Sequence, residues 1–283
     1  SWAPSPPRAD VSPGAEDAAA SGPVPIVLVH GIAGSTADWA AVVPDLAAER
    51  RVVAYDQRGH GTSGRAPGGR ADYTFDLLLA DLGMLVDTLG AERIDLVGHS
   101  MGGVISLRYT LDQPGRVRSL VLVDTAAAPA NATGPVARRM VGVVLDRIAE
   151  FASSRRRLTS GEDVEATRHE TNPAQRQVTS LTRVDPDALA AFGQELGDYP
   201  SLVGRLGEIS VPTTVIVGEQ DGALRDSART MADAIPGAHL AVIADADHSP
   251  HASRPLAWLS AVDSHLTRLA TAPHPGNDPP PTS

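Results

Sequence analysis

The sequence predicts an α/β protein with a mostly parallel central sheet, flanking helices and a helical cap inserted into the chain. Three observations predict this fold class. Short runs that are apolar throughout, as in strands buried on both faces, alternate with segments of helical periodicity. One such run ends at a Gly-x-Ser-x-Gly motif, Gly98–Gly102, and a helix-forming segment follows the motif. Strand-like runs then disappear between residues 126 and 210, which indicates the inserted cap.

Composition and charge limit the partners of this chain. Its 283 residues carry a formal net charge of -10, and no block of Lys or Arg could follow a phosphate backbone, so we expect no nucleic-acid partner. No apolar run approaches the ~20 residues of a membrane span, which predicts no stable membrane insertion. Because there is no cysteine, disulfides and thiolate metal sites are excluded. We expect a small-molecule substrate and a cytoplasmic location, with an extracellular location after processing as the alternative; the oligomeric state is not predicted.

The domain boundaries follow changes in composition. Residues 1–23 are rich in Pro, Ala, Ser and Gly without a hydrophobic period, and we expect a disordered N-terminal extension there. Residues 272–283 have the same character and are predicted to be a disordered tail. Residues 24–125 and 211–271 together form the predicted α/β core, and residues 126–210 form the predicted cap.

The elements before the cap are predicted from hydrophobic periodicity. Thr74 is expected to cap one helix, because a Thr oxygen can accept a hydrogen bond from a free backbone N–H, and Gly90 is expected to end it. The predicted strands are Ile26–Val29, Val52–Tyr55, Ile94–Val97 and Leu120–Val123, and the predicted helices are Asp38–Ala48, Phe75–Leu89 and a segment from Met101 to about Asp112.

The second half of the chain contains one predicted helix inside the cap, around Asp187–Leu196. An arginine cluster, Arg155–Arg157, lies in the same region and is interpreted as a solvated surface. The β/α alternation then resumes with the strand Thr213–Val217, a helix Ser227–Ile235 capped by Asp226, the strand Leu240–Ile243 and a last helix entered at Pro255.

Ser100 is the candidate nucleophile. It lies at the apex of the Gly98–Gly102 motif, where the chain turns from a strand directly into a helix. Such a turn needs small residues on both sides, because a Cβ there would strike the neighbouring backbone. The apex residue is expected to be strained, with its side chain exposed above the sheet at the N-terminus of a helix.

The chain resembles the α/β-hydrolase superfamily, in particular its esterase, enol-lactonase and cofactor-free haloperoxidase branch. The resemblance covers roughly residues 24 to 270 and implies the α/β-hydrolase fold, with the helical cap after the sixth strand. It depends on five motifs that occur in the family's order: His30-Gly31, Asp56-Gln-Arg-Gly-His-Gly-Thr-Ser63, Gly98-His-Ser-Met-Gly-Gly103, Gly218-Glu-Gln-Asp221 and Asp247-His248.

The resemblance implies a catalytic triad of Ser100, Asp221 and His248, which match the family order of nucleophile, acid and base. This agrees with the chemistry, since a serine needs a base to take its proton and the imidazole needs a carboxylate to orient it. Asp221 and His248 follow different strands, and the ends of parallel strands converge at one edge of the sheet. Asp124 is the alternative acid, because it also ends a strand, and His251 is the alternative base.

The resemblance also implies an oxyanion hole made by the backbone N–H groups of Ile32 and Met101. Such donors stabilise the negative oxygen that forms when an acyl group is attacked. Gly31 and Trp39 are expected to contribute to the substrate-binding site.

Three other histidines are interpreted as structural. His30 and His60 are expected to hold loops through hydrogen bonds, and His99 is expected to face away from the apex and to pack or hydrogen-bond there. No group of His and carboxylate residues shows metal-ligand spacing, and no Gly-x-Gly-x-x-Gly follows a strand, so the sequence predicts neither a metal nor a cofactor.

These residues predict a serine hydrolase that cleaves a small ester or lactone through an acyl-enzyme. A serine at the apex, where related dehalogenases carry Asp, favours acyl transfer. The alternatives are a biosynthetic tailoring enzyme that uses the same pocket for lyase, perhydrolysis or cyclisation chemistry, and a C–C bond hydrolase. A non-catalytic binding protein on this fold is expected to have lost part of the triad, and this chain retains all three residues.

Overall fold

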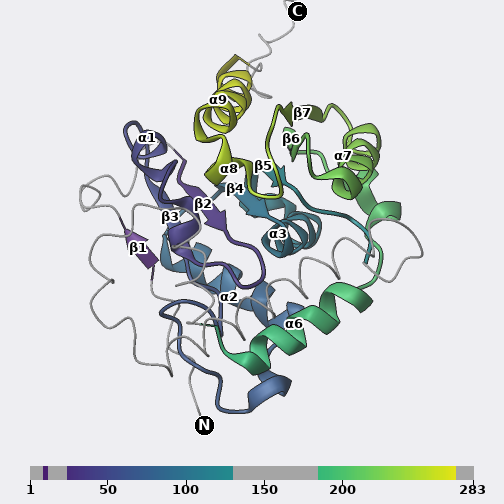
Figure 1. Cartoon of the computed structure of the whole chain (residues 1–283). Helices are drawn as coiled ribbons and strands as arrows, with labels where there is room; N and C mark the ends of the chain where they lie inside the picture. The colour runs from purple at the N-terminus through teal and green to yellow at the C-terminus, as the bar shows by residue number, and fades with distance from the viewer. Residues whose placement is uncertain (1–8, 12–23, 130–183, 272–283) are drawn as a thin grey trace, which may run out of the picture.

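The computed structural model describes residues 9–11, 24–129 and 184–271 (Figure 1). Its seven-stranded sheet has the order β1-β3-β2-β4-β5-β6-β7. β1 pairs with β3 in the antiparallel direction, and all the other neighbours are parallel. The strands are β1 (Ala9–Val11), β2 (Ile26–Val29), β3 (Val52–Tyr55), β4 (Ile94–His99), β5 (Val117–Val123), β6 (Thr213–Gly218) and β7 (His239–Ile243).

Helices cover the two faces of this sheet, as the apolar strands predict. One face packs against α2, α3 and α7, and α6 joins the same hydrophobic core; the other face packs against α1 and α9. Alternate residues of each central strand enter the two cores; in β2, for example, Val27 joins the first and Leu28 the second. The helices are α1 (Val43–Leu46), α2 (Phe75–Thr88), α3 (Met101–Asp112), α6 (Pro186–Asp198), α7 (Gly222–Ala234), α8 (Pro250–Ser253) and α9 (Pro255–Thr271).

The two edges of the sheet differ from the expectation. Residues Ala9–Val11 form β1 although they lie in the extension predicted to be disordered, because the edge of β3 offers backbone groups that pair whatever the side-chain pattern. At the other edge, β7 is not covered on both faces: Leu240 and Val242 are 39% and 47% exposed. An apolar run predicts a strand, but it does not show whether that strand lies at an edge.

The predicted helix at Asp38–Ala48 is two short elements. A 3-10 helix, η1 (Thr36–Trp39), begins at Ser35, whose side chain accepts a hydrogen bond from the Ala37 N–H. α1 then starts at Val43. Pro44 in its first turn explains the break, because proline has no N–H with which to continue the preceding hydrogen-bond ladder.

The predicted helix at Ser227–Ile235 begins five residues earlier than expected. α7 starts at Gly222, with Asp221 at the capping position, and the Leu224 and Arg225 N–H groups donate to the Asp221 carbonyl. Asp226, the predicted cap, therefore lies inside the helix. Its exposed polar side chain lies in the second turn, where it has the residue type of a cap without the position of one.

The long helix before the serine motif agrees with its prediction. The Thr74 Oγ1 accepts a hydrogen bond from the Leu77 N–H at 3.3 Å, so Thr74 caps α2. Gly90 follows the C-cap residue Leu89 with a φ of 65°, in the left-handed region that favours glycine. Two further 3-10 turns, η2 (Gly69–Asp72) and η3 (Pro114–Arg116), lie in the connections around α2 and α3.

The predicted cap is described only over its last part, residues 184–210. This part contains α6 and the 3-10 helix η5 (Val203–Glu208) and no strand, as expected. Residues 130–183, which include Arg155–Arg157, lie outside the described residues. Five strands precede the insertion in the described part of the chain, so the expected place after a sixth strand is one strand too late.

Contacts with the core fix the position of α6 below the sheet edge (Figure 1). The Tyr73 hydroxyl donates to Asp185, just before α6, at 2.7 Å, and the Phe75 N–H donates to Glu195 within it. Phe192 packs against the rings of Tyr73 and Phe75. Among the described residues, no helix combines the length and the apolar character that a membrane span requires.

Candidate active site

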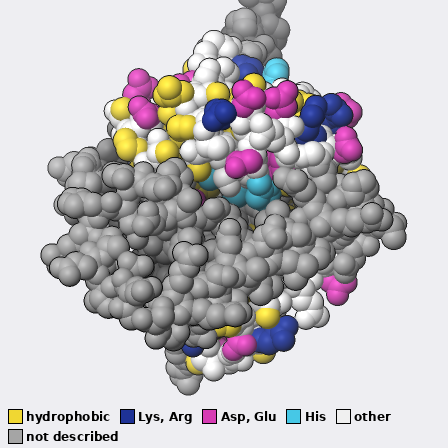
Figure 2. Space-filling view, in the orientation of Figure 1, with side chains coloured by type: hydrophobic (Ala, Val, Ile, Leu, Met, Phe, Trp, Pro, Cys, Tyr) yellow, Lys and Arg dark blue, Asp and Glu magenta, His cyan; other side chains and the backbone are white. Residues whose placement is uncertain are grey.

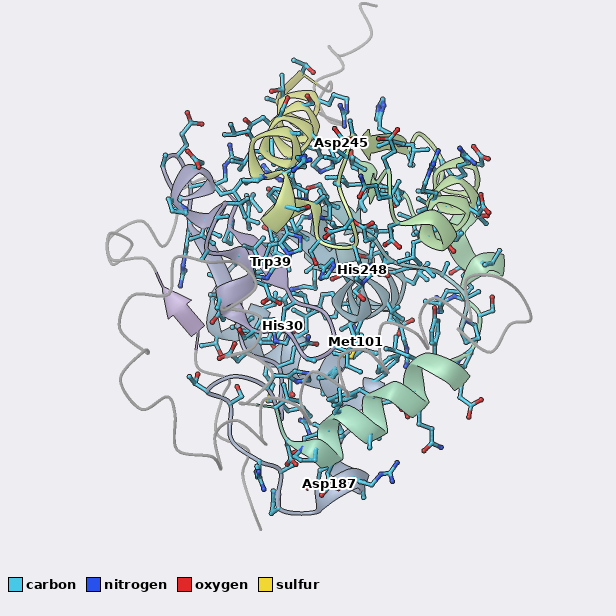
Figure 3. The ribbon with its side chains drawn as sticks, in the orientation of Figure 1. His30, Trp39, Met101, Asp187, Asp245 and His248 are labelled. Carbon is cyan, nitrogen blue, oxygen red and sulfur yellow. The ribbon has the colours of Figure 1, made fainter. Side chains whose placement is uncertain are left out.

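The candidate triad assembles at one edge of the parallel sheet. Ser100 follows β4, Asp221 follows β6 by three residues, and His248 follows β7 by five. Because these three strands are parallel, their carboxyl ends meet at the same edge, which is where ligands bind in open α/β sheets. Figure 3 shows His248 near Met101, the residue after Ser100, in the middle of the molecule.

The three side chains form a continuous hydrogen-bond chain. The Ser100 Oγ lies 3.0 Å from the His248 Nε2, and the His248 Nδ1–H donates to the Asp221 Oδ2 at 2.6 Å. Ser100 and Asp221 are buried, and 14% of the His248 side chain is exposed. Figure 2 shows histidine side chains reaching the surface near the centre of this face, beside acidic side chains. The Asp221 carboxylate can only accept, so it places the ring hydrogen on Nδ1 and leaves Nε2 without one, able to accept the hydrogen bond of the Ser100 hydroxyl.

The turn that carries Ser100 is strained, as predicted. Ser100 has φ 53° and ψ −119°, a conformation that non-glycine residues rarely adopt. Its N–H donates to the Val123 carbonyl at 2.9 Å, which ties the turn to β5. A Cβ on Gly98 would lie 2.4 Å from the Gly102 carbonyl oxygen, and a Cβ on Gly102 would lie 2.2 Å from the Val29 carbonyl oxygen. The glycines of the motif are therefore required by close backbone packing.

A Gly102→Ala variant is expected to lose at least about 2 kcal/mol of unfolding free energy, because its methyl group would meet rigid backbone. Gly83→Ala is the matched control. Gly83 is also a helical glycine, but its nearest contact would be Tyr109 at 3.9 Å, so alanine is expected to add about 0.5–1 kcal/mol. Urea denaturation of the two variants checks this; a Gly102→Ala protein as stable as the wild type would show that the turn tolerates a side chain.

The predicted oxyanion donors lie next to Ser100. Met101 is the first residue of α3, where backbone N–H groups have no partner within the helix. Within the described chain, the N–H groups of Ile32 and Met101 donate no hydrogen bond to another residue. Gly31, beside Ile32, approaches the serine so closely that a Cβ on it would lie 3.0 Å from the Ser100 Cβ. Two unused donors therefore flank the serine.

His30 and His60 accept hydrogen bonds that hold the loop carrying Ile32, in agreement with their predicted structural roles. The His30 Nε2 accepts from the Gln57 N–H at 3.0 Å, and the His60 Nε2 accepts from the Ala33 N–H at 3.1 Å. Burial lowers the pKa of His60 to about 3, so its ring stays neutral and can accept this bond. The loop after β2 is therefore fixed to the loop after β3.

Asp56 anchors the second of these loops. Its carboxylate accepts hydrogen bonds from the N–H groups of Thr36 and Thr62, both at 2.7 Å, and from the Thr62 hydroxyl at 3.0 Å. Burial alone would raise the pKa of Asp56, but these bonds outweigh burial and lower it. Polar groups from both loops thus converge on one ionised carboxylate.

The His99 ring packs against Trp39 and His251 in the core on the α1 and α9 face, in agreement with its predicted packing role, and it supports the candidate base. Its Nε2–H donates to the His248 carbonyl at 2.7 Å, and the two rings lie 5.0 Å apart. Thr125, which the sequence did not single out, donates from Oγ1 to the Ser100 carbonyl at 2.7 Å. The signal for Thr125 is the sheet register: His99 pairs with Val123, which brings the residue two positions later beside the serine turn.

Trp39 and His251 are not at the site. Trp39 is completely buried and packs against the rings of His99, His251 and Trp258 in the core on the α1 and α9 face. Because the indole is enclosed in this core, its contacts do not support the predicted contribution to substrate binding. The His251 ring packs against Trp39 with the ring centroids 4.4 Å apart, and it is His248 that accepts the hydrogen bond of the Ser100 hydroxyl. Residue type and spacing alone do not show that Trp39 and His251 belong to the core and not to the site.

The buried His251 predicts a loss of stability in acid. Burial lowers the pKa of His251 from 6.5 to about 3. Between these two pH values the unfolded chain binds a proton at this residue and the folded protein does not. Stability is therefore full above pH 6.5 and falls as the pH decreases toward 3, by about 1.4 kcal/mol per pH unit for each such histidine. In urea denaturation at pH 7.5, 6 and 5, we expect His251→Phe to lose less stability than the wild type; parallel losses would contradict this.

Asp124, the alternative acid, lies behind Asp221. Its Oδ1 accepts a hydrogen bond from the Gly218 N–H at 2.9 Å. The hydrogen bond of the His248 Nδ1–H is accepted by Asp221 and not by Asp124. Asp124, Asp221 and His248 also form a group of described residues whose ligand atoms lie within 4.8 Å of one another. However, the direct 2.6 Å hydrogen bond between His248 and Asp221 leaves no room for an ion between these two atoms.

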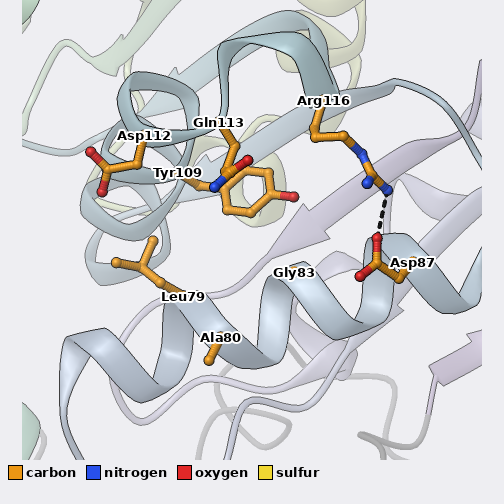
Figure 4. Close-up of a pocket in the computed structure, with 8 residues that line it drawn as sticks. All are labelled: Leu79, Ala80, Gly83, Asp87, Tyr109, Asp112, Gln113 and Arg116. Atoms are coloured by element: carbon orange, nitrogen blue, oxygen red, sulfur yellow. Dashed lines mark ion pairs between the residues drawn. The ribbon is translucent and has the colours of Figure 1, made fainter.

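A surface crevice between α2 and α3 lies away from this site. It is spanned by an ion pair between Arg116 and Asp87 at 2.8 Å, and it contains none of the candidate triad (Figure 4). Its lining residues are Leu79, Ala80, Gly83, Asp87, Tyr109, Asp112, Gln113 and Arg116.

Comparisons with known proteins agree with this architecture. The family model described as the alpha/beta hydrolase fold matches residues 24–255. The enol-lactonase from Burkholderia xenovorans LB400 is similar with a TM-score of 0.73 and 26% identity, covering 92% of this chain and 96% of its own. A thermophilic esterase from Thermogutta terrifontis has a TM-score of 0.69 and 26% identity, over 88% and 92% of the two chains. A 2-hydroxy-6-oxo-2,4-heptadienoate hydrolase of Pseudomonas putida is 43% identical over 102 residues, which cover 35% of this chain and 36% of that relative.

Proposed function

Because this chain belongs to the α/β-hydrolase fold family, we propose that it is a serine hydrolase that cleaves a small ester or lactone through an acyl-enzyme. The observation that carries the proposal is the hydrogen-bond chain from Ser100 through His248 to Asp221 at the carboxyl edge of the sheet. The hydrolase, lactonase and esterase names of similar proteins support the reaction class.

In this mechanism, His248 Nε2 takes the proton of the Ser100 hydroxyl as the oxygen attacks the acyl carbon. The 3.0 Å separation is within hydrogen-bonding reach, as a general base requires. The Asp221 carboxylate holds the imidazole through Nδ1 and stabilises the positive charge that forms on it. His248 then gives the proton to the departing alcohol, and the acyl group remains on Ser100.

The negative oxygen of the tetrahedral intermediate would be stabilised by the N–H groups of Ile32 and Met101. These donors are held in place before the reaction, by the bond to His60 on one side and by the start of α3 on the other. Fixed donors need no reorganisation when the charge develops, and the N-terminus of a helix favours a negative charge. Water activated by His248 then attacks the acyl-enzyme in the same geometry and releases the acid.

The test is covalent labelling of the wild-type chain with a fluorophosphonate, followed by peptide mapping. We expect one label on Ser100 and turnover within a series of p-nitrophenyl esters from acetate to octanoate and a set of lactones. The chain length with the highest kcat/KM would measure the acyl pocket. A folded protein that takes no label would refute the acyl-enzyme mechanism, and a labelled Ser100 without turnover of any ester or lactone would move the proposal to the tailoring reactions.

A further inference from the structure

We propose that Asp124 is a positioning residue: a neutral carboxylic acid whose Oδ2–H donates a hydrogen bond to the carboxylate of Asp221. The inference rests on the proposed function, because Asp124 acts through the triad acid. It gives a role to a buried acidic residue that the acyl-transfer mechanism itself does not use.

Asp124 is directed toward the triad by the backbone. It follows the last residue of β5 and has a φ of 42°, in the left-handed region that few residues other than glycine adopt. Its N–H donates to the Ile216 carbonyl and its Oδ1 accepts from the Gly218 N–H, both at 2.9 Å, so both ends of the residue are fixed to β6. The residue is 1% exposed.

Its second oxygen lacks a donor. Oδ2 of Asp124 is buried and receives no hydrogen bond from the described part of the chain. A carboxylate oxygen of Asp124, a carboxylate oxygen of Asp221 and a ring nitrogen of His248 lie within 4.8 Å of one another, and the Asp124 side chain is within hydrogen-bonding reach of Asp221. If both acids were ionised, two negative charges would lie close together at a buried position, where solvent screens their repulsion only weakly. A proton shared between the acids removes this conflict.

The surroundings place that proton on Asp124. Asp221 accepts the Nδ1–H of His248 at 2.6 Å, an interaction that favours its ionised form. Asp124 accepts only the Gly218 N–H among the described donors, and burial together with the charges of Asp221 and the exposed Asp247 raises its pKa well above the usual range, against that one bond. His248 also lies close to Asp124, but its Nδ1–H is donated to Asp221.

A neutral Asp124 suits the reaction. The pair of acids then carries one negative charge, which matches the one positive charge that His248 acquires in the transition state. Two charges would stabilise the protonated imidazole before the reaction and would reduce the fraction of His248 able to accept the serine proton. The donated hydrogen bond also fixes the rotamer of Asp221.

The experiment compares Asp124→Asn with Asp124→Ala by the pH dependence of kcat/KM on the best ester. An asparagine reproduces the neutral acid, since its oxygen accepts from Gly218 and its amide donates to Asp221. We therefore expect Asp124→Asn to keep kcat/KM within about threefold of the wild type. The acid limb of the profile, which is the decrease of kcat/KM at low pH, is expected to stay at the same pH. Alanine removes the donor, so we expect a loss of about tenfold or more and an acid limb at higher pH, because the negative charge concentrates on Asp221.

A charge-removing control and a spectroscopic readout complete the test. Asp247→Asn removes an exposed carboxylate and is expected to move the acid limb slightly to lower pH, which shows that the assay detects a lost charge. An infrared band of a protonated carboxyl group is expected in the wild type at neutral pH and not in Asp124→Asn. If circular dichroism shows that Asp124→Ala does not fold, the pH profile of Asp124→Asn and the infrared band still test whether Asp124 is protonated.

An acid limb that moves by about half a pH unit or more to lower pH in Asp124→Asn would show that Asp124 is ionised, and would overturn the inference. A missing carboxyl band would do the same. Both outcomes would leave the proposed function intact as long as the wild type is labelled on Ser100 and turns over ester. A wild type that takes no label would instead refute the proposed function.

Discussion

Ser100→Ala is expected to lower kcat for ester hydrolysis by about 10⁴-fold or more and to abolish fluorophosphonate labelling. The loss is large because Ser100 supplies the only oxygen that His248 Nε2 activates within the described site, at 3.0 Å. Residual hydrolysis would come from the oxyanion donors and from substrate binding, which do not need the hydroxyl. KM is expected to change little, since the hydroxyl contributes mainly to the transition state.

Ser264→Ala is the matched control for this measurement. Ser264 is exposed on α9 and its hydroxyl donates only to the Ser260 carbonyl in the same helix, so the variant is expected to retain labelling and turnover. Comparable initial rates for Ser100→Ala and the wild type, on protein with the same circular dichroism spectrum, would exclude Ser100 as the nucleophile.

Asp221→Asn is expected to lower kcat by about 10³- to 10⁴-fold. The Asp221 carboxylate accepts the Nδ1–H of His248 at 2.6 Å, whereas an asparagine can turn an N–H toward the ring and favour the wrong tautomer. The Nε2 of that tautomer carries a hydrogen and cannot accept the serine proton. Steady-state kinetics across pH 6 to 9 would measure the loss.

Asp226→Asn provides the comparison on the same helix. Asp226 is exposed on α7 and pairs with Arg229 at 3.4 Å, so replacing it is expected to leave kcat unchanged. An Asp221→Asn enzyme that retained most of the wild-type kcat would show that another carboxylate orients His248, and Asp124 would be the residue to replace next.

The strands and the serine turn could be predicted from the sequence because their signals are local. A strand such as Val52–Tyr55 is buried on both faces, so its apolar run coincides with the element. The Ser100 turn is specified within five residues, since each glycine of the motif is required by backbone only a few ångströms away. The order of nucleophile, acid and base could also be read along the chain, and the structure places those three side chains within hydrogen-bonding distance.

Other features depend on where distant segments pack, which a one-dimensional pattern does not contain. Trp39 has the character of a pocket residue, but the packing of α9 encloses it in the core with Trp258. The start of α7 depends on the turn after β6, and the exposure of β7 depends on its position at the edge of the sheet.

The sequence by itself determined the α/β fold class, the strained serine turn and a short set of candidate acids and bases. Only the tertiary structure decided between candidates of the same residue type. His248 rather than His251 reaches Ser100, and Asp221 rather than Asp124 holds the imidazole. The physical reason is that hydrogen bonding and protonation depend on distances and burial of a few ångströms, and these are fixed when strands far apart in the chain converge at one edge of the sheet.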